Sequence, residues 1–530
     1  MAERKSRYDA IVIGGGHNGL TAAGYLARAG KSVLVLERRG IVGGAAVTEE
    51  VAPGCRVSSC SYIASMLRPE VIRELGLAKH GLSMVPCDPA LNMPVADGSI
   101  VRLWADPART AAELSRYSAR DAAAFERIDA ELKRLARYLQ PFFLEPPPNL
   151  AATGFDRLRE IARLAKRFWG ISGEDGAAML RFLTGSLAEF LDRHFEAEET
   201  KRLFLGNNVY GKHGGPYDAG STLGLLFHLL AGGEEEAQGF AGHVIGGMGA
   251  ITQAMAKAAE GFGATILTDA PVATVLTRNG RATGVALEDG REFSAPLVLS
   301  NADPKRTFLG LLDAGDLDPE FRADVAAIRM AGPAAKVNMV LAEAPVITGI
   351  PTSAPPAEQA GFSVMGGLEQ VQRLYDRAKF GELDEELWVD VIIPSQVDKT
   401  LCPPDRWMMT CFVQYVPYQL RDGDWNDKRE WLGDRVVELI GRHAPNVPGS
   451  VLARKVLTPL DLEQTYGLTE GNIFHGDLHL GQLFFMRPLP AWSQYKTPIE
   501  GLYLCGAGAH PGGGVTGAPG RNAAMAALKG

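Results

Sequence analysis

A glycine-rich turn between two apolar runs constrains the fold of this chain more than any other feature. Residues 10–13 and residues 32–36 are short apolar runs of the kind that form buried parallel strands. Residues 20–29 between them have the small and apolar composition of a helix that packs on a sheet. The turn before that helix has G-x-G-x-x-G spacing, made by Gly14, Gly16 and Gly19. This order of elements predicts a dinucleotide-binding βαβ unit.

Each glycine of the turn has a separate physical role. Gly14 permits the tight turn, Gly16 lets the backbone approach a pyrophosphate, and Gly19 lets the helix pack closely on the strand. The helix N-terminus adds free N–H groups and a partial positive charge. Glu37 stands 18 residues after Gly19, where a carboxylate can bind both ribose hydroxyls and disfavours a 2′-phosphate. The turn therefore predicts a dinucleotide other than NADP.

Chance spacing is the alternative, because 61 glycines in 530 residues produce such patterns without function. The flanking strands, the helix and the acid make that alternative the weaker one. A second glycine pair, Gly43 and Gly44, follows six residues past Glu37 and gives another place where backbone can press against a dinucleotide. An NAD-only domain has no need of this pair, so we expect a flavin-binding loop rather than a plain one.

Length and charge limit the number of domains and the classes of function that the chain can have. A chain of 530 residues buries enough surface for more than one domain. Its 54 basic and 62 acidic residues give a net charge of −8, which argues against a general nucleic-acid binder. Residues 1–7 are charged and leave no room for a signal peptide, and no apolar run reaches the roughly 20 residues of a membrane span. We expect a cytoplasmic protein, or a mitochondrial matrix protein if the source is eukaryotic.

The six cysteines predict neither a disulfide framework nor a metal site. Cys55 and Cys60 have the C-x4-C spacing of a redox pair, as in flavin disulfide reductases. In those enzymes the pair follows the glycine pair almost at once, whereas Cys55 comes 11 residues after Gly44. We therefore expect two ordinary cysteines. The remaining four show no metal-ligand spacing, so no metal is expected.

The middle of the chain changes from helical to mixed patterns. Residues 110–139 show helical spacing of apolar residues, residues 264–300 return to strands and hairpins, and residues 310–470 are mixed α+β. Residues 155–169 form an amphipathic segment in which five basic residues stand among leucines and aromatics. Such a segment can lie on a membrane surface. Because only one appears, we favour a solvated helix over a packed core and keep peripheral membrane contact as the alternative.

Further motifs, taken in their order along the chain, resemble the phytoene desaturase-like flavoprotein oxidoreductases, the bacterial carotenoid desaturase type. They add to the glycine turn residues 36–39, 43–46, 246–249, 284–285, 300–303, 471–475 and 502–512. The resemblance covers almost the whole chain and is greatest for the branch called pyridine nucleotide-disulfide oxidoreductase domain-containing protein 2. Several motifs in the correct order are far more specific than any one alone.

The resemblance implies an α/β fold built on a glutathione-reductase-type FAD-binding Rossmann domain that is discontinuous in sequence. Residues 1–75, 241–310 and 471–530 would form this domain. Residues 76–240 would begin the substrate domain and include a helical subdomain, and residues 311–470 would complete its mixed α+β part. FAD would be held non-covalently, with the substrate domain roofing the flavin over an apolar, hydrophobic small-molecule substrate.

The resemblance also implies which residues hold FAD. The glycine turn would bind the pyrophosphate, Glu37 the adenosine ribose, and the backbone of Val272 the adenine end. A helix that starts near Gly517 would direct its dipole at the pyrimidine side of the flavin. The expected cofactor-binding residues are Gly14, Gly15, Gly16, Asn18, Gly19, Glu37, Arg38, Gly43, Gly44, Ala45, Val272, Gly506, Gly508, Gly517 and Ala518.

A disulfide reductase carries a second G-x-G-x-x-G for NAD(P)H, and none follows a strand in the middle of this sequence. We therefore expect oxygen, a quinone or another diffusible electron acceptor. The reaction we expect is hydride transfer from a carbon of the substrate, and an isoprenoid or carotenoid-like molecule is a candidate for that substrate. The alternatives are a flavin amine oxidase, a flavoprotein with a binding or regulatory role and little turnover, and a flavin-dependent isomerase.

The catalytic groups are the least constrained part of the sequence. His475, His510, His479 and Tyr210 stand near segments expected to face the flavin, and they are the candidates for proton transfer. A histidine in a glycine-rich loop is more often a structural hydrogen-bonding group. His17 stands in the phosphate turn, so a structural or phosphate-binding role suits it better than acid–base chemistry. The sequence does not fix the oligomeric state.

Overall fold

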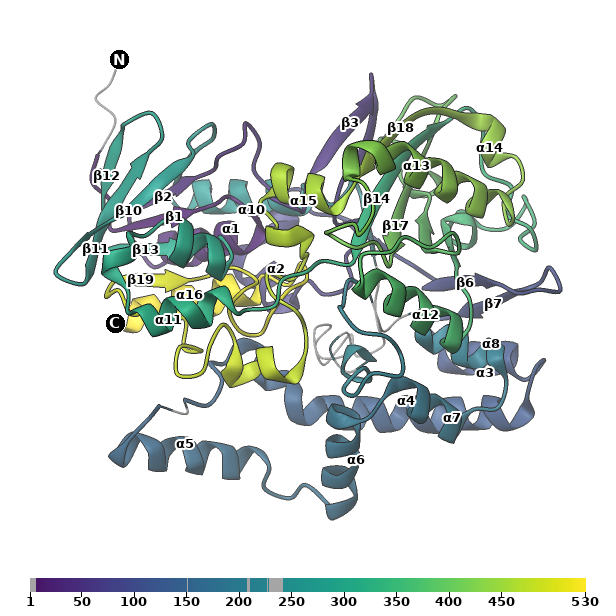
Figure 1. The fold of residues 1–530 in the computed structure, drawn as a ribbon, viewed down its shortest axis with the longest axis horizontal. Helices are drawn as coiled ribbons and strands as arrows, with labels where there is room; N and C mark the ends of the chain where they lie inside the picture. Colours follow the sequence, from purple (N-terminus) through teal and green to yellow (C-terminus); the bar gives the residue numbers. More distant parts are fainter. Residues whose placement is uncertain (1–5, 150, 207–209, 226, 228–241) are drawn as a thin grey trace.

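A five-stranded parallel sheet lies at the left of Figure 1. The structure is a computed structural model that describes residues 6–149, 151–206, 210–225, 227 and 242–530. The strand order is β19-β13-β1-β2-β9, and all four pairings are parallel. The strands are β1 (Ala10–Ile13), β2 (Val33–Leu36), β9 (Thr265–Leu267), β13 (Leu297–Ser300) and β19 (Leu502–Leu504). Three widely separated stretches of chain thus build one sheet.

Three helices pack together beside this sheet because small residues let their backbones approach. Helix α1 (His17–Arg28) lies against both α10 (Gly249–Gly261) and α16 (Ala518–Lys529). A Cβ atom on Gly520 would lie 2.0 Å from the carbonyl oxygen of Asn18, so only glycine allows α16 to cross α1 this closely. An antiparallel sheet of β10 (Val272–Arg278), β11 (Arg281–Leu287) and β12 (Glu292–Ser294) accompanies the parallel one.

A second five-stranded sheet, at the right of Figure 1, has the order β15-β16-β17-β14-β18 and antiparallel pairings throughout. Its strands are β14 (Ala334–Leu341), β15 (Gly361–Val364), β16 (Trp388–Ile392), β17 (Trp407–Gln414) and β18 (Val451–Leu457). Alternate residues such as Val337, Val389 and Cys411 share an apolar core with helix α13 (Trp425–Gly441). The opposite residues of the same strands therefore face another part of the molecule.

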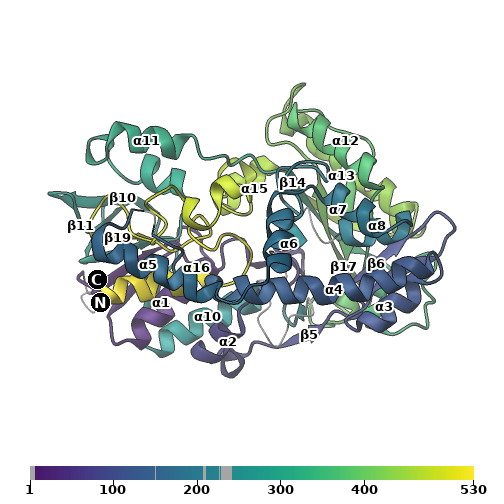
Figure 2. The ribbon, with the colours of Figure 1, turned by 90° about the horizontal axis from the view of Figure 1, so that it is seen from below.

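A helical subdomain lies below both sheets in Figure 1 and is seen from beneath in Figure 2. Its helices are α3 (Pro107–Leu114), α4 (Ala119–Leu139), α5 (Gly154–Arg167), α6 (Gly173–Thr184), α7 (Leu187–His194) and α8 (Glu198–Leu205). The helical pattern predicted over residues 110–139 is interrupted once. Ser118 caps α4 there, because its hydroxyl accepts a hydrogen bond from the Asp121 backbone N–H at 3.0 Å.

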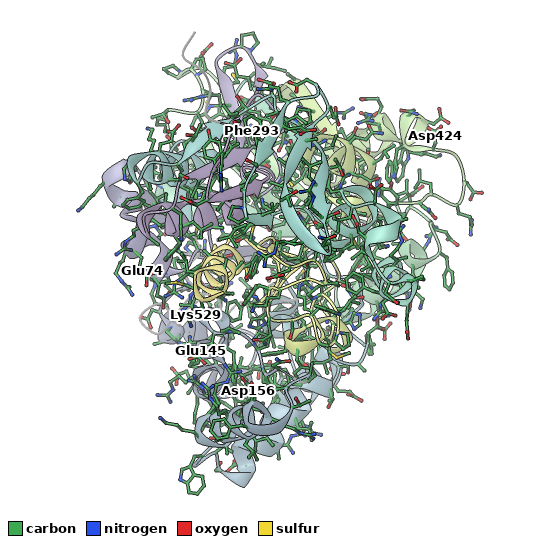
Figure 3. The ribbon with its side chains drawn as sticks, turned by 90° about the vertical axis from the view of Figure 1, so that its left-hand side faces the viewer. Glu74, Glu145, Asp156, Phe293, Asp424 and Lys529 are labelled. Atoms are coloured by element: carbon green, nitrogen blue, oxygen red, sulfur yellow. The ribbon has the colours of Figure 1, made fainter. Side chains whose placement is uncertain are left out.

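Helix α5 agrees in part with the solvated helix over a packed core that the sequence favoured. Every residue of α5 keeps exposed surface; Phe155 at its start is 74% exposed, and Trp169 just past its end is 85% exposed. Its contact with the apolar cluster of the helical subdomain is made by Leu164 and Phe168, which are half-buried. Figure 3 shows Asp156 of α5 at the far end of the molecule from Phe293 of β12. The segment therefore packs on the core through Leu164 and Phe168 as predicted, whereas the rest of its apolar side chains are exposed.

The remaining elements connect these parts. They are β3 (Thr48–Ala52), β4 (Cys55–Ser58), α2 (Pro69–Leu75), β5 (Met84–Pro86), β6 (Leu91–Pro94), β7 (Ile100–Leu103), β8 (Gly242–Val244), α11 (Pro319–Ala326), α12 (Leu368–Lys379), α14 (Val447–Ser450) and α15 (Pro459–Tyr466). Across the described ranges, no helix has both the length and the apolar character needed to cross a membrane. The α/β class with a Rossmann-type sheet, a mixed second domain and a helical part is confirmed.

Candidate functional site

A cavity of about 690 Å³ lies between the glycine-rich turn and the second sheet. One wall comes from the ends of β1 and β2, the start of α1 and the segment after β13. The other wall comes from β14, β15, β16 and β17, with residues 60–66 and Tyr210. Parallel α/β sheets bind ligands outside the carboxyl ends of their strands, and this cavity lies there.

Eight of the fifteen expected cofactor-binding residues line this cavity, and the other seven do not. The lining residues are Gly14, Gly16, Asn18, Glu37, Arg38, Gly44, Ala45 and Val272. The residues outside the lining are Gly15, Gly19, Gly43, Gly506, Gly508, Gly517 and Ala518. The expected segments therefore meet at one cavity, although single positions differ in whether they face it.

Backbone contacts of glycines outside the cavity lining hold the glycine-rich turn in place. The N–H of Gly15 donates to Oε2 of Glu37 at 2.8 Å, and the N–H of Gly43 donates to the carbonyl of Gly15 at 2.9 Å. The N–H of Arg39 donates to Oε1 of the same carboxylate at 2.9 Å. A Cβ atom on Gly19 would lie 2.1 Å from the Gly14 carbonyl oxygen. These contacts fix the turn and the Glu37 carboxylate relative to each other.

The C-terminal glycine run also contributes, through different residues from those expected. Ala507, Gly514 and Val515 line the cavity, whereas Gly506 and Gly508 pack against the segment after β13. A Cβ atom on Gly508 would lie 2.4 Å from Cδ of Pro304. Gly517 has a φ of +73° and precedes the first residue of α16, as the sequence predicted for a helix starting there.

Two buried polar atoms of the cavity wall fit a bound dinucleotide. Within the part of the chain that the structure describes, Oδ1 of Asn18 and Nδ1 of His475 have no hydrogen-bond partner. Helix α1 starts at His17 after Gly16, which has no side chain to cap its free N–H groups. Unpaired buried polar groups are rare without a ligand, so donor and acceptor groups here match an anionic, polar cofactor such as FAD.

The structure separates the four candidates for proton transfer. His475 and Tyr210 line the cavity, and burial lowers the pKa of His475, which keeps its imidazole neutral. Nε2 of His510 instead lies 2.6 Å from the carbonyl oxygen of Phe142, outside the cavity lining. His479 also lies outside, with Nε2 3.2 Å from Nε of Arg329. These placements leave His475 and Tyr210 as candidates.

His17 faces the C-terminal glycine run. Its Nε2 lies 3.0 Å from the carbonyl oxygen of Gly514, and it lines the cavity. Burial lowers its pKa to about 4 although this backbone contact acts in the opposite direction. A neutral imidazole that joins the two glycine-rich segments matches the structural role expected for it.

Sequence reasoning missed a row of residues on the second sheet. Ser363, Asp390, Phe412 and Lys336 stand opposite one another on β15, β16, β17 and β14. Asp390, Phe412 and Lys336 line the cavity, together with Tyr62 from the loop after β4. The signal in the sequence is the alternation of polar and apolar residues in strands that are otherwise buried.

Burial perturbs both charged members of this row. Desolvation raises the pKa of the Asp390 carboxyl, although hydrogen bonds from Ser363 and Tyr62 act against this. Desolvation lowers the pKa of Lys336 to about 8. Nζ of Lys336 donates to Oγ1 of Thr410 at 2.7 Å and lies 4.1 Å from the centre of the Tyr62 ring. Perturbed groups in a cleft are a common mark of a functional site.

The cysteines show no reactive thiol at this site. All six are free, and Cys60, which lines the cavity, has its pKa raised by burial to about 12. Burial also raises the pKa of Cys55, which packs in a separate apolar cluster. A thiol with a raised pKa is a poor nucleophile. Among the described residues, no group of three or more His, Cys, Asp or Glu side chains could hold a metal ion.

Comparison with known proteins assigns this architecture. Residues 19–358 match the family described as flavin containing amine oxidoreductase. The chain belongs to this family. It is accordingly an FAD-dependent oxidoreductase, which confirms the cofactor and the enzyme class expected from the sequence.

Individual relatives agree with the family. The chain is 39% identical to pyridine nucleotide-disulfide oxidoreductase domain-containing protein 2 of Mus musculus, over 98% of this chain and 93% of the mouse protein. It is 27% identical to the phytoene desaturase (neurosporene-forming) of Rhodobacter capsulatus, over 96% and 91% of the two chains. Both likenesses confirm the expected resemblance.

Solved structures share the fold. Wild-type putrescine oxidase bound to putrescine covers 99% of this chain and 98% of its own, with a TM-score of 0.58 and 16% sequence identity. At this identity the likeness shows the fold alone. The fold that carries the two sheets and the glycine-rich segments is therefore shared with a solved oxidase.

Proposed function

We propose that this flavoprotein oxidises an apolar small molecule bound between the glycine-rich segments and the second sheet. The observation that carries the proposal is the cavity itself, in which a dinucleotide-binding wall faces a wall rich in aliphatic and aromatic side chains. That second wall includes Phe362, Ile392 and Phe412, and Ile473 and Phe474 from the segment after residue 471 also line the cavity. A phytoene desaturase among the relatives supports an isoprenoid or carotenoid-like substrate.

The chain would hold FAD with the eight expected residues that line the cavity, together with Ala507, Gly514 and Val515 of the C-terminal glycine run. Glu37 would accept hydrogen bonds from the ribose, and the free N–H groups at the start of α1 would face the pyrophosphate. When bound, FAD supplies a two-electron acceptor for hydride from a substrate carbon. His475 and Tyr210 are the residues that would move a proton at the cavity wall. Oxygen or a quinone would then take the electrons.

Flavin bleaching tests this proposal. The purified protein should be yellow, and anaerobic mixing with a carotenoid-like substrate, either phytoene or a hydroxylated carotenoid, should bleach the flavin absorption. Oxygen or a soluble quinone should then restore it. A colourless protein that takes up no added FAD would contradict the cofactor assignment. A yellow protein that neither phytoene nor hydroxylated carotenoids bleach would contradict the apolar substrate.

An amine oxidase is the second candidate function, and aromatic rings at the cavity favour it. The Tyr62 ring stacks on Phe412 with centroids 5.8 Å apart, and the Tyr210 ring meets the same phenylalanine edge-on, also at 5.8 Å. Aromatic rings can bind a substrate ammonium group. Bleaching by putrescine or cyclohexylamine, with none by phytoene, would favour this candidate over the first.

The composition of helix α5 supports a peripheral contact with anionic membranes. Such a contact would let a cytoplasmic protein take an apolar substrate from the membrane. The helix carries five basic and two acidic residues, in a chain of net charge −8. Its exposed apolar side chains include Phe155, Leu158 and Ile161. Basic residues beside exposed apolar ones are the pattern of helices that lie in a membrane interface.

Vesicle sedimentation tests this contact. The double variant Phe155→Ser/Leu158→Ser should lose binding to vesicles that contain phosphatidylserine. Phe380→Ser is the matched control, because Phe380 is also highly exposed but lies at the end of α12. Equal sedimentation of wild type and double variant would remove α5 from the proposal and leave the redox function untouched.

A further inference from the structure

Hydroxyl and carboxyl groups gather on the cavity wall formed by the second sheet. Oδ2 of Asp390 accepts a hydrogen bond from the Tyr62 hydroxyl at 2.9 Å, and Oδ1 accepts one from the Ser363 hydroxyl at 2.5 Å. The Tyr210 hydroxyl also hydrogen-bonds to Asp390 and to Ser363. Asp390, Tyr62 and Tyr210 all line the cavity. This polar cluster consists of Asp390, Tyr62, Tyr210 and Ser363.

Apolar groups enclose the polar cluster on the remaining sides. The Tyr210 ring lies 5.0 Å from the Trp388 ring, and the Tyr62 ring stacks on Phe412. Phe362 from the neighbouring strand β15 and Ile392 from the strand of Asp390 line the same cavity. Water-poor surroundings strengthen each hydrogen bond made there and raise the cost of leaving a polar group unpaired.

A hydrocarbon alone would not use this arrangement. A wall that contacted only hydrocarbon would need no carboxyl group, and a buried carboxyl group is costly unless it is hydrogen-bonded. The phenol groups keep their protons, because burial raises the pKa of Tyr62 and of Tyr210 well above the ordinary value. The wall therefore offers both donors and an acceptor at one place.

Lys336 decides which polar group fits. It is fully buried, lines the same wall and lies against the Tyr62 ring. A substrate ammonium beside the Tyr62 ring would meet this cation, and like charges at short range repel each other. A neutral group that both donates and accepts hydrogen bonds avoids this repulsion and satisfies the carboxyl and the phenols together.

We propose that Asp390, Tyr62 and Tyr210 recognise one hydroxyl group on an otherwise apolar substrate. The substrate hydroxyl would donate to the Asp390 carboxyl and accept from a phenol hydroxyl that turns away from Asp390 to reach it. This inference rests on the proposed function, because it names the substrate class of the same cavity. An analogue that lacks the hydroxyl gains none of these hydrogen bonds, so the site should prefer the alcohol to the alkane.

Matched small ligands test the site in the full-length, FAD-loaded protein. Octan-1-ol, octane and octylamine have the same chain length and differ in the terminal group. Isothermal titration calorimetry should give octan-1-ol a Kd lower than that of octane by about tenfold or more, the ratio expected for a hydrogen bond to a buried polar group. Octylamine should bind more weakly than the alcohol.

The variant Tyr62→Phe removes one hydroxyl and keeps the ring that stacks on Phe412. Its preference for octan-1-ol over octane should fall to within about threefold, while its affinity for octane stays near that of the wild type. Unchanged octane affinity shows that the pocket is intact, so a purely structural role cannot produce this result. Tyr138→Phe is the matched control, because the Tyr138 hydroxyl bonds to Asp175 in the helical subdomain at 3.3 Å.

Each other outcome overturns the inference. Equal affinity of the wild type for the alcohol and the alkane, or failure to bind the alcohol, shows that no hydroxyl is recognised. A preference that survives in Tyr62→Phe shows that these residues do not provide it. Tighter binding of octylamine assigns the site to a cation. A protein that retains FAD but shows one of these results loses only this inference, whereas a protein without FAD loses the proposed function as well.

Discussion

Lys336 is a buried cation whose titration should be visible in the stability of the protein. Its pKa is lowered to about 8 by burial, whereas an ordinary lysine has a pKa of 10.5. Between these values the unfolded chain binds a proton that the folded chain lacks. Stability therefore rises with pH across this window and is level below pH 8, and the whole effect is on the order of 3 kcal/mol.

Urea unfolding of the wild type and Lys336→Met measures this effect. The free energy of unfolding of the wild type, relative to the variant, should increase from about pH 7.5 to about pH 9.5. Subtracting the variant removes the titration of other groups, since methionine fills a similar volume without a charge. A difference that stays constant over this range would show that Lys336 titrates normally in the folded protein.

Glu37 should control FAD retention. Its two carboxylate oxygens accept backbone hydrogen bonds from Gly15 and Arg39, and its side chain lines the cavity. Glu37→Ala should weaken FAD binding by about tenfold or more, because a bond to a charged group is lost and the turn loosens. Fluorescence titration of FAD measures the change. Glu292→Ala, at an exposed position on β12, should bind FAD as the wild type does.

At single positions the sequence predicts residues of a local motif better than side chains that meet only in the folded protein. Gly14, Gly16 and Glu37 could be placed because the βαβ unit fixes their spacing locally. Asp390 and Lys336 could not, because their meeting depends on the register of strands far apart in sequence. His510 shows the converse: its partner is the carbonyl of Phe142, 368 residues away, which no local pattern encodes.

Close packing of α16 on α1 sets the geometry at the start of both helices. Asn18 lines the cavity, and Gly520 of α16 touches its carbonyl group. Gly520→Ala should force the helices apart and lower the free energy of unfolding by about 1–3 kcal/mol. Gly176→Ala in α6 is the matched control, since nothing lies within 4 Å of a Cβ there. That control should stabilise the protein by about 0.5–1 kcal/mol.

Melting temperatures compare these two variants directly. A Gly520→Ala protein that melts with the wild type would show that α16 can shift from α1 without cost. Among the elements, the two strands of the glycine-turn unit were predicted to within one residue because short apolar runs mark them, whereas α1 starts three residues before the predicted helix. The exposure of α5 was not predicted. Amphipathic spacing shows which face of a helix is apolar, but it does not show what covers that face.

The whole molecule should be stabilised when FAD binds. Residues from widely separated stretches of the chain, such as Gly14, Asn301 and Ala507, line the cavity, so the site exists only in the folded chain. FAD at a hundredfold excess over its Kd should raise the free energy of unfolding by about 2.7 kcal/mol. Scanning calorimetry of the apoprotein with and without FAD measures this. Identical transitions would mean that the unfolded chain binds FAD equally well or that the folded chain does not bind it.

The fold of the whole chain was predictable because many motifs occur in one order, and each constrains its neighbours. The partition into domains at residues 75, 240, 310 and 470 stays a prediction. The substrate-facing wall was the least predictable part. Its strands come from residues 311–470, and none of the glycine motifs lies in that segment.

The parallel sheet has a consequence for synthesis of the protein. Strand β13 pairs on one side with β1, which is already made, and on the other with β19, which follows about 200 residues later. At ribosomal speed that edge of β13 waits roughly 10–40 s for its partner. An open strand edge is a template for wrong pairing. FAD loading must therefore come late, and the growing chain is most vulnerable to aggregation in the interval before β19 emerges.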